Sequence, residues 1–405
     1  MRLSRWFRAA FLVLGLLPAT RTARAGHFTL EEAIRRAKER SPAAVDARGA
    51  LTSAEASGAG AKVSAFGNPS LEVTGQTSRA TRDVNVIGSL YVPVEVSGQR
   101  GARISEWQKL VEWQGSVEAR VHAEVTAATA FAYGGVLVAR ARLEQATRAT
   151  VETRAEAEAY TARLAVGDAT AYDVSVVDSE YARYRQLEVA ASASLVQAVA
   201  RLSELVGGEA PAELAAEPEP PALPEGLRVE EWIDRSPALR ALGKESRYWS
   251  SVRERAESDR SAPLVVIATG GRGDYGEARV GGGLGWSFPV FRRNQGDIAR
   301  AGAERSRTER VGVALRAALM QRARGALAAY RGLLTGIDEL DRTGIPAAER
   351  AAAAVAAAQR AGKVEMIRVI IARRDLAAAR ARRLDLVEVA WSAYAELASI
   401  RGELP

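Results

Sequence analysis

Few residues of the sequence are of a type and spacing that could support catalysis or bind a metal. The chain of 405 residues has no cysteine, which excludes disulfides and thiolate metal ligands. Its two histidines, His27 and His122, lie far apart and have no neighbouring ligand pattern, so they predict neither a zinc site nor a catalytic triad. The sequence therefore favours a protein that is not an enzyme and that holds no metal and no cofactor.

One glycine pattern resembles a nucleotide-binding motif. Gly271, Gly273 and Gly276 have the spacing of a dinucleotide-binding loop, in which helix N-terminal amides bind a diphosphate. Here the pattern follows one expected strand and leads into another strand, so the helix that binds the phosphates is missing. We interpret it as a loop between two strands.

The basic surplus of the chain is concentrated at its N-terminus. The sequence has 56 basic and 49 acidic residues, and residues 1–25 contain five arginines and no acid. Without that segment 51 basic residues face 49 acidic ones, which gives no case for a nucleic-acid binder. Residues 1–25 have a basic start, an apolar stretch over residues 9–17 and an Ala-Arg-Ala end, which predict a secretory signal peptide.

The remaining chain contains the same order of landmarks twice. The pairs Ser41-Pro42 and Ser236-Pro237, Pro93 and Pro289, and Gly167 and Gly362 are each separated by 195 or 196 positions. We therefore expect a first half over residues 26–206 and a second half over 227–405. Between them, residues 207–226 are rich in proline and glutamate, which predicts an extended connector.

Long helices dominate the expected secondary structure. Residues 99–165 contain no proline and are rich in good helix formers, which predicts a helix roughly 100 Å long. The next helix and its counterpart in the second half have apolar residues that alternate at steps of three and four, as in a coiled coil. These positions are Val174, Val177, Tyr181, Tyr184, Glu188, Ala191, Leu195, Ala198, Leu202 and Leu205, and then Val369, Ala372, Leu376, Ala379, Arg383, Leu386, Ala390, Ala393, Leu397 and Ile400.

Four segments near 69–79, 84–95, 263–270 and 278–291 alternate apolar and polar residues, as membrane β-strands do. Val280, Leu284, Trp286, Phe288 and Val290, for example, alternate with small or polar residues. A soluble sandwich has a similar alternation. Four strands are too few to close a membrane barrel, and an open edge is not tolerated in hydrocarbon, so several chains would have to share one barrel.

The order of these motifs resembles the TolC family of outer-membrane efflux ducts over residues 28–401. The duplication, the helix lengths and two strand-to-helix junctions, PVEVSGQRGARI at 93–104 and FPVFRRNQGDIARA at 288–301, carry the resemblance. The second junction is similar to the cation-efflux, cobalt–zinc–cadmium type subgroup. The resemblance implies a mainly α fold with β: a homotrimer in which four strands per chain form a 12-stranded outer-membrane barrel above a periplasmic α-helical barrel.

The resemblance also implies partners and a role. The chain would be the exit duct of a tripartite efflux pump, with a periplasmic adaptor protein and an inner-membrane pump of the resistance-nodulation-division type. Heavy-metal cations are the cargo of the subgroup, and ducts for drug export or type I protein export are alternatives. A periplasmic coiled-coil scaffold without a transport role is a further alternative from the residue pattern alone.

Two helix turns are the expected docking tips. They contain Arg163, Leu164 and Gly167 in the first half, and Arg360, Gly362 and Lys363 in the second. In the family, the residue six positions after each glycine lies at the pore constriction and is often acidic. Here these positions hold Asp173 and Arg368, so we expect an ion pair between them to act as the gate. Glu188 and Arg383 occupy equivalent positions in the two halves, 195 residues apart, and we expect an ion pair between them to set the register of the helices.

Overall fold

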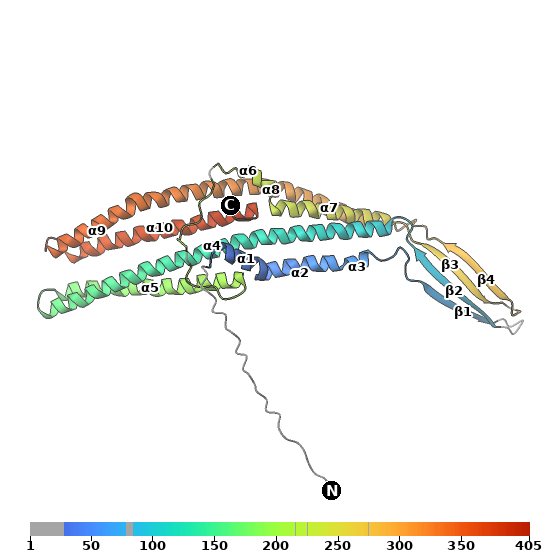
Figure 1. The fold of residues 1–405 in the computed structure, drawn as a ribbon, viewed down its shortest axis with the longest axis horizontal. Helices are drawn as coiled ribbons and strands as arrows, with labels where there is room; N and C mark the ends of the chain where they lie inside the picture. Colours follow the sequence, from blue (N-terminus) through green and yellow to red (C-terminus); the bar gives the residue numbers. More distant parts are fainter. Residues whose placement is uncertain (1–27, 78–83, 215, 225, 274) are drawn as a thin grey trace, which may run out of the picture.

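The computed structural model describes residues 28–77, 84–214, 216–224, 226–273 and 275–405, so the expected signal peptide lies outside the described residues. The molecule is a long, gently curved rod (Figure 1). A four-stranded sheet forms one end, two helix turns form the other, and the C-terminus lies in between. The mainly α architecture with a small sheet agrees with the sequence prediction.

The first half of the chain contains the order helix, strands, long helix, helix. Its elements are α1 (Leu30–Arg40), α2 (Pro42–Ala56), α3 (Gly58–Ala61), β1 (Ser70–Thr77), β2 (Val84–Val94), α4 (Gln99–Ala165) and α5 (Ala171–Val206). The bounds of α4 are those of the proline-free segment. Ser41 ends α1 and caps α2, because its hydroxyl accepts the amide hydrogen of Ala44.

The second half has a similar order of elements. It comprises α6 (Glu230–Ile233), α7 (Pro237–Ser258), β3 (Leu264–Arg272), β4 (Ala278–Gly285), α8 (Gln295–Glu339), a π-helical turn η1 (Leu340–Gly344), α9 (Ile345–Arg360) and α10 (Met366–Arg401). The π-turn ends two residues before Pro346, whose ring and missing N–H disturb a regular helix.

The connector between the halves is fastened to a core of aromatic side chains. Tyr330 donates to the Pro221 carbonyl at 2.6 Å, and Trp391 donates to the Pro218 carbonyl at 2.7 Å. The same core contains Tyr133 and Tyr394, and burial raises the pKa of Tyr394 to about 12. The large apolar residues of both halves therefore meet midway along the rod.

The positions with coiled-coil spacing that the sequence analysis gave on α5 and α10 are all buried or half-buried. On α10 more residues are buried than these positions alone, and the additional ones include Leu384, Val387 and Trp391. The reason is that α10 packs against both α4 and α8, whereas α5 packs mainly against α4. The exposed face of α5 remains apolar at Leu187 and Val196.

The four strands form one antiparallel sheet in the order β1-β2-β3-β4, with β1 and β4 at its edges. The register separates its two faces, because paired residues of neighbouring strands point to the same side. One face is mainly apolar, with Leu71, Val73, Val86, Leu90, Val92, Val266, Ala268, Val280 and Leu284, and its one charged strand residue among those described is Arg272 at the end of β3. The other face is more polar and contains Ser70, Glu72, Thr74, Gln76, Asn85, Ser89, Tyr91, Thr269, Arg279 and several glycines, together with the apolar residues Ile87, Pro93, Val265 and Ile267.

The fourth strand is shorter than predicted. It ends at Gly285, so the expected continuation through Trp286, Phe288 and Val290 is wrong. Pro289 cannot donate to a ladder, and the Val290 amide instead bonds to the Phe288 carbonyl at 2.9 Å. The aromatic rings of Trp286 and Phe288 pack together just beyond the strand, with 4.7 Å between their ring centroids.

Candidate functional site

The end of the rod opposite the sheet is formed by two nearly identical helix turns (Figure 1). In the first turn the Asp168 amide bonds to the Arg163 carbonyl and the Gly167 amide to the Leu164 carbonyl. The turn at Gly362 repeats both bonds, from Lys363 to Ala358 and from Gly362 to Gln359. This is the Schellman pattern of helix ends.

Glycine is required in these turns by conformation rather than by space. The φ angles are 76° at Gly167 and 68° at Gly362, in the left-handed region that favours glycine. No atom outside the immediate backbone lies within 4 Å of where a Cβ would be at either glycine. The turns are thus determined locally, and their outer surface is open.

All six residues predicted at the tips are exposed: Arg163, Leu164, Gly167, Arg360, Gly362 and Lys363. Val166, which the sequence analysis did not single out, is 79% exposed at the apex of the first turn. Arg163 is held by Asp168 at 2.9 Å, whereas no ion pair of Arg360 or Lys363 occurs among the described residues. The tips therefore present apolar and basic groups together.

The predicted gate pair does not form within the chain. Asp173 instead closes a capping box with Thr170 at the start of α5: each backbone amide bonds to the other's side chain, at 3.1 and 3.0 Å. The hydrogen bond from the Thr170 hydroxyl, at 2.6 Å, holds the pKa of Asp173 below its usual value. Arg368 is exposed and has no ion pair with any described residue.

The predicted register pair does not form within the chain either. Glu188 accepts from Arg185 at 2.7 Å and from the Thr147 hydroxyl at 3.1 Å. Arg383 binds Asp341 of the π-turn at 2.5 Å and Glu219 of the connector. The reason is that α4 lies between α5 and α10 in this part of the rod, so the two side chains face different neighbours (Figure 1).

Nearer the tips, α5 and α10 are joined by a pair that the sequence analysis missed. The carboxylate of Glu180 is buried, at 3% exposure, and it binds Arg374 of α10, with Arg183 3.5 Å away. The sequence could have predicted that Glu180 faces the buried side of α5, because it lies three positions after Val177 and four before Tyr184, which is the coiled-coil spacing.

A small apolar cluster of side chains from α4, α5 and α10 also connects the two helical hairpins. It contains Ala157, Val177, Met366, Val369 and Ile370. Two polar links reinforce it: Gln359 donates to the Tyr160 hydroxyl at 2.7 Å, and Arg373 of α10 binds Glu156 of α4. The ends of both hairpins are therefore fastened together within one protomer.

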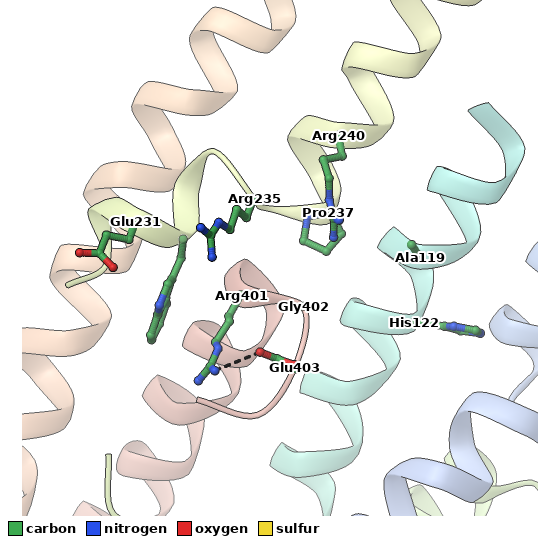
Figure 2. A pocket seen from close by; sticks show the side chains of 10 residues that line it. Ala119, His122, Glu231, Arg235, Pro237, Arg240, Arg401, Gly402 and Glu403 are labelled. Atoms are coloured by element: carbon green, nitrogen blue, oxygen red, sulfur yellow. Dashed lines mark ion pairs between the residues drawn. The ribbon is translucent and has the colours of Figure 1, made fainter. Parts of the chain in front are cut away.

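The structure also contains a cavity of about 490 Å³ midway along the rod, where α7 begins and α10 ends. Figure 2 shows three arginines around it, Arg235, Arg240 and Arg401, with Arg401 paired to Glu403 at 3.0 Å. Its lining contains no pairing of a nucleophile with a base. Over the described ranges, no group of three or more His, Asp and Glu side chains is arranged to hold a metal ion.

Comparison with known proteins places these features in a family context. No model of a known protein family matches the sequence. The chain is 28% identical over 349 residues to the cobalt-zinc-cadmium resistance protein CzcC of Cupriavidus metallidurans, covering 83% of this chain and 81% of that protein. The similarity supports the predicted resemblance to the cation-efflux subgroup.

Solved structures extend the comparison to the whole fold. The outer membrane protein VceC of Vibrio cholerae matches with a TM-score of 0.73 at 17% identity, covering 93% of this chain and 97% of that one. The CmeC outer membrane channel of Campylobacter jejuni matches with a TM-score of 0.75 at 11% identity, covering 93% and 86%. The chain has the TolC-family fold. The fold class predicted from the sequence is thereby confirmed.

Proposed function

We propose that this chain is the outer-membrane exit duct of a tripartite efflux pump and that three copies form the duct. The observation that carries the proposal is the sheet: it has one apolar face, two open edges and a helical rod attached at one end. A membrane barrel needs an apolar outer face and no open edge, so β1 of one protomer would pair with β4 of the next.

Aromatic side chains mark where the membrane would end on the helical side. Phe66, Trp286, Phe288 and Phe291 are all exposed and lie next to the strand ends that join the helices. Membrane barrels have such aromatic girdles at their interfaces, whereas a water-soluble sheet gains nothing from them. A purely periplasmic scaffold is accordingly not favoured.

The exposed apolar face of α5 supports assembly of the helical part. An 18-residue apolar window of α5 is only 11% buried in the single chain, and Val189 and Val196 are among its exposed residues. Burial of such side chains against a neighbouring protomer contributes about 25 cal/mol per Å². The helical barrel would therefore close by contacts between neighbouring protomers, as the strand barrel does.

The tips would dock a periplasmic adaptor, and the adaptor would connect to an inner-membrane pump. Val166 and Leu164 offer apolar contact, and Arg163, Arg360 and Lys363 offer positive charge. Asp173 and Arg368 are proposed as gate residues only between neighbouring protomers, since they do not meet within one chain. The two halves, residues 26–206 and 227–405, joined through 207–226, would alternate around the tube wall.

The proposed cargo is heavy-metal cations, because CzcC is a cobalt-zinc-cadmium resistance protein. The test is deletion of the gene in its host, followed by growth on Co²⁺, Zn²⁺ and Cd²⁺ and on a panel of drugs. Increased sensitivity to the metals, restored by the wild-type chain, supports the proposal. Sensitivity confined to drugs, or loss of a secreted protein, would assign the duct to another pump.

Assembly is tested separately on the purified protein. A trimer that is extracted only by detergent and that migrates faster on gels before heating than after is expected for a closed barrel. Release of the protein by osmotic shock as a soluble chain would contradict the membrane duct.

A further inference from the structure

The polar face of the sheet carries few charges among the described strand residues. They are Glu72 of β1 and Arg279 of β4, and they lie on the same side because Glu72 pairs with Ser89, Ser89 with Thr269 and Thr269 with Gly281. Arg279 is two residues from Gly281 on the same strand, and alternation keeps it on that side.

Arg279 is already neutralised. Its guanidinium donates two hydrogen bonds to one carboxylate oxygen of Glu277, at 2.9 and 2.6 Å, in the turn between β3 and β4. Glu72 has a different environment. Its carboxylate accepts from the Tyr91 hydroxyl at 3.1 Å, and no described lysine or arginine lies within 4 Å of it. Among the described strand residues, the polar face therefore has a net negative charge at Glu72.

This face must be the inner face if the sheet is part of a barrel. The opposite side carries Leu71, Val73 and Leu284, which suit lipid, whereas a carboxylate on the lipid side would be costly. In the row of Glu72, the paired positions on β2, β3 and β4 hold Ser89, Thr269 and Gly281, so the residues that follow Glu72 across the sheet have short side chains. The row thus leaves room for hydrated ions near the carboxylate.

We infer that Glu72 is a selectivity residue: three Glu72 carboxylates, one from each protomer, form a ring inside the barrel that favours cations over anions. The inference rests on the proposed trimeric duct and deepens it. Charges that line a water-filled passage raise the local concentration of counter-ions. The effect must weaken with salt, because the screening length falls from about 30 Å at 10 mM to about 3 Å at 1 M.

The experiment is the reversal potential of the purified trimer in planar bilayers under a KCl gradient centred on about 10 mM. The wild-type channel is expected to prefer K⁺ over Cl⁻. Glu72→Gln, which keeps the shape and the hydrogen bond from Tyr91, should lower the K⁺/Cl⁻ permeability ratio by about two- to tenfold. Glu72→Lys should reverse the preference, and near 1 M salt the variants should converge.

A relocated charge provides the matched control. The double variant Glu72→Gln/Ser89→Glu moves the carboxylate to the paired position on β2, at the same height and on the same face, and should restore the preference for K⁺. Open channels whose permeability ratio is the same in wild type and Glu72→Gln would overturn the role of Glu72 and leave the duct standing. Absence of any channel from correctly extracted wild-type protein would overturn both.

Discussion

The buried carboxylate of Glu180 on α5 binds the Arg374 guanidinium on α10, and it thereby joins two hairpins that are far apart in the sequence. The hydrogen bond with Glu180 raises the pKa of Arg374 above its ordinary value. Glu180 is nearly inaccessible while Arg374 is half exposed, so the carboxylate depends on its partner more than the arginine does. A buried charge that loses its partner is costly.

We predict that Arg374→Ala loosens the tip of the first hairpin. The carboxylate of Glu180 would keep only the more distant Arg183, at a cost of about 1–3 kcal/mol. Amide hydrogen exchange over the first turns of α5 should become roughly tenfold faster or more. The double variant Glu180→Ala/Arg374→Ala should cost less than the sum of the single variants. Arg380→Ala, which breaks an exposed pair with Glu349, is the control and should cost at most about 1 kcal/mol. Strict additivity of Glu180 and Arg374 would refute the coupling.

Asp173→Ala should shorten α5 at its start, because the capping box with Thr170 would be lost. The expected cost is about 0.5–2 kcal/mol, seen as faster exchange of the first α5 amides.

If Asp173 also meets Arg368 of a neighbouring protomer, both Asp173→Ala and Arg368→Ala should raise the conductance of the trimer, and the double variant should add little. Asp178→Ala, an exposed charge on the same helix, is the control. Unchanged conductance in both single variants would leave Asp173 with the helix cap alone.

Charge on the apolar face of the sheet should block insertion, whereas charge on the polar face should not. Leu284→Arg is expected to cost roughly 2–4 kcal/mol near the middle of the membrane. Gly283→Arg is the matched control, because it places the same side chain one residue away on the opposite face, where space is open. The measurement is the yield of detergent-extracted, heat-modifiable trimer. Equal yields from the two variants would argue against a membrane barrel.

The contact between α4 and α7 should weaken in acid. Lys109 and Lys244 donate to Glu112 at 2.8 and 2.7 Å and lower its pKa to about 2. Because this pKa lies below the unfolded value of 4.5, the stabilisation is complete above about pH 4.5 and is lost as the pH falls towards 2. The Glu112 side chain is more than a third exposed, so its ion pairs contribute at most about 1 kcal/mol to the free energy of unfolding.

The corresponding test compares thermal midpoints of wild type and Glu112→Gln between pH 7 and pH 2. The wild type should be the more stable protein at pH 7, and the difference should vanish near pH 2. Glu124→Gln, which removes an exposed carboxylate from the same helix, controls for the loss of one charge. A difference that persists unchanged at pH 2 would mean that Glu112 acts through packing.

Local patterns in the sequence determined the secondary structure and the faces of its elements. The proline-free run from Gln99 to Ala165 is one helix, the three–four spacing on α5 marks its buried side, and the alternation in β1, β2 and β4 marks the two faces of the sheet. Gly167 and Gly362 mark the turns at the tips. Each of these features depends on residues within a few positions of one another, so each is present in the sequence itself.

Only the tertiary structure decided which charges meet. Arg383 has a long side chain that reaches two other segments, and it binds Glu219 of the connector and Asp341 of the π-turn rather than Glu188, because α4 separates α5 from α10. Glu180 is at seam spacing in the sequence, but its partner Arg374 is 194 positions away. The end of β4 at Gly285 likewise depends on how Pro289 and the packed rings of Trp286 and Phe288 continue the chain. An ion pair is decided by distances between elements, and those distances are determined by helix packing rather than by any local pattern.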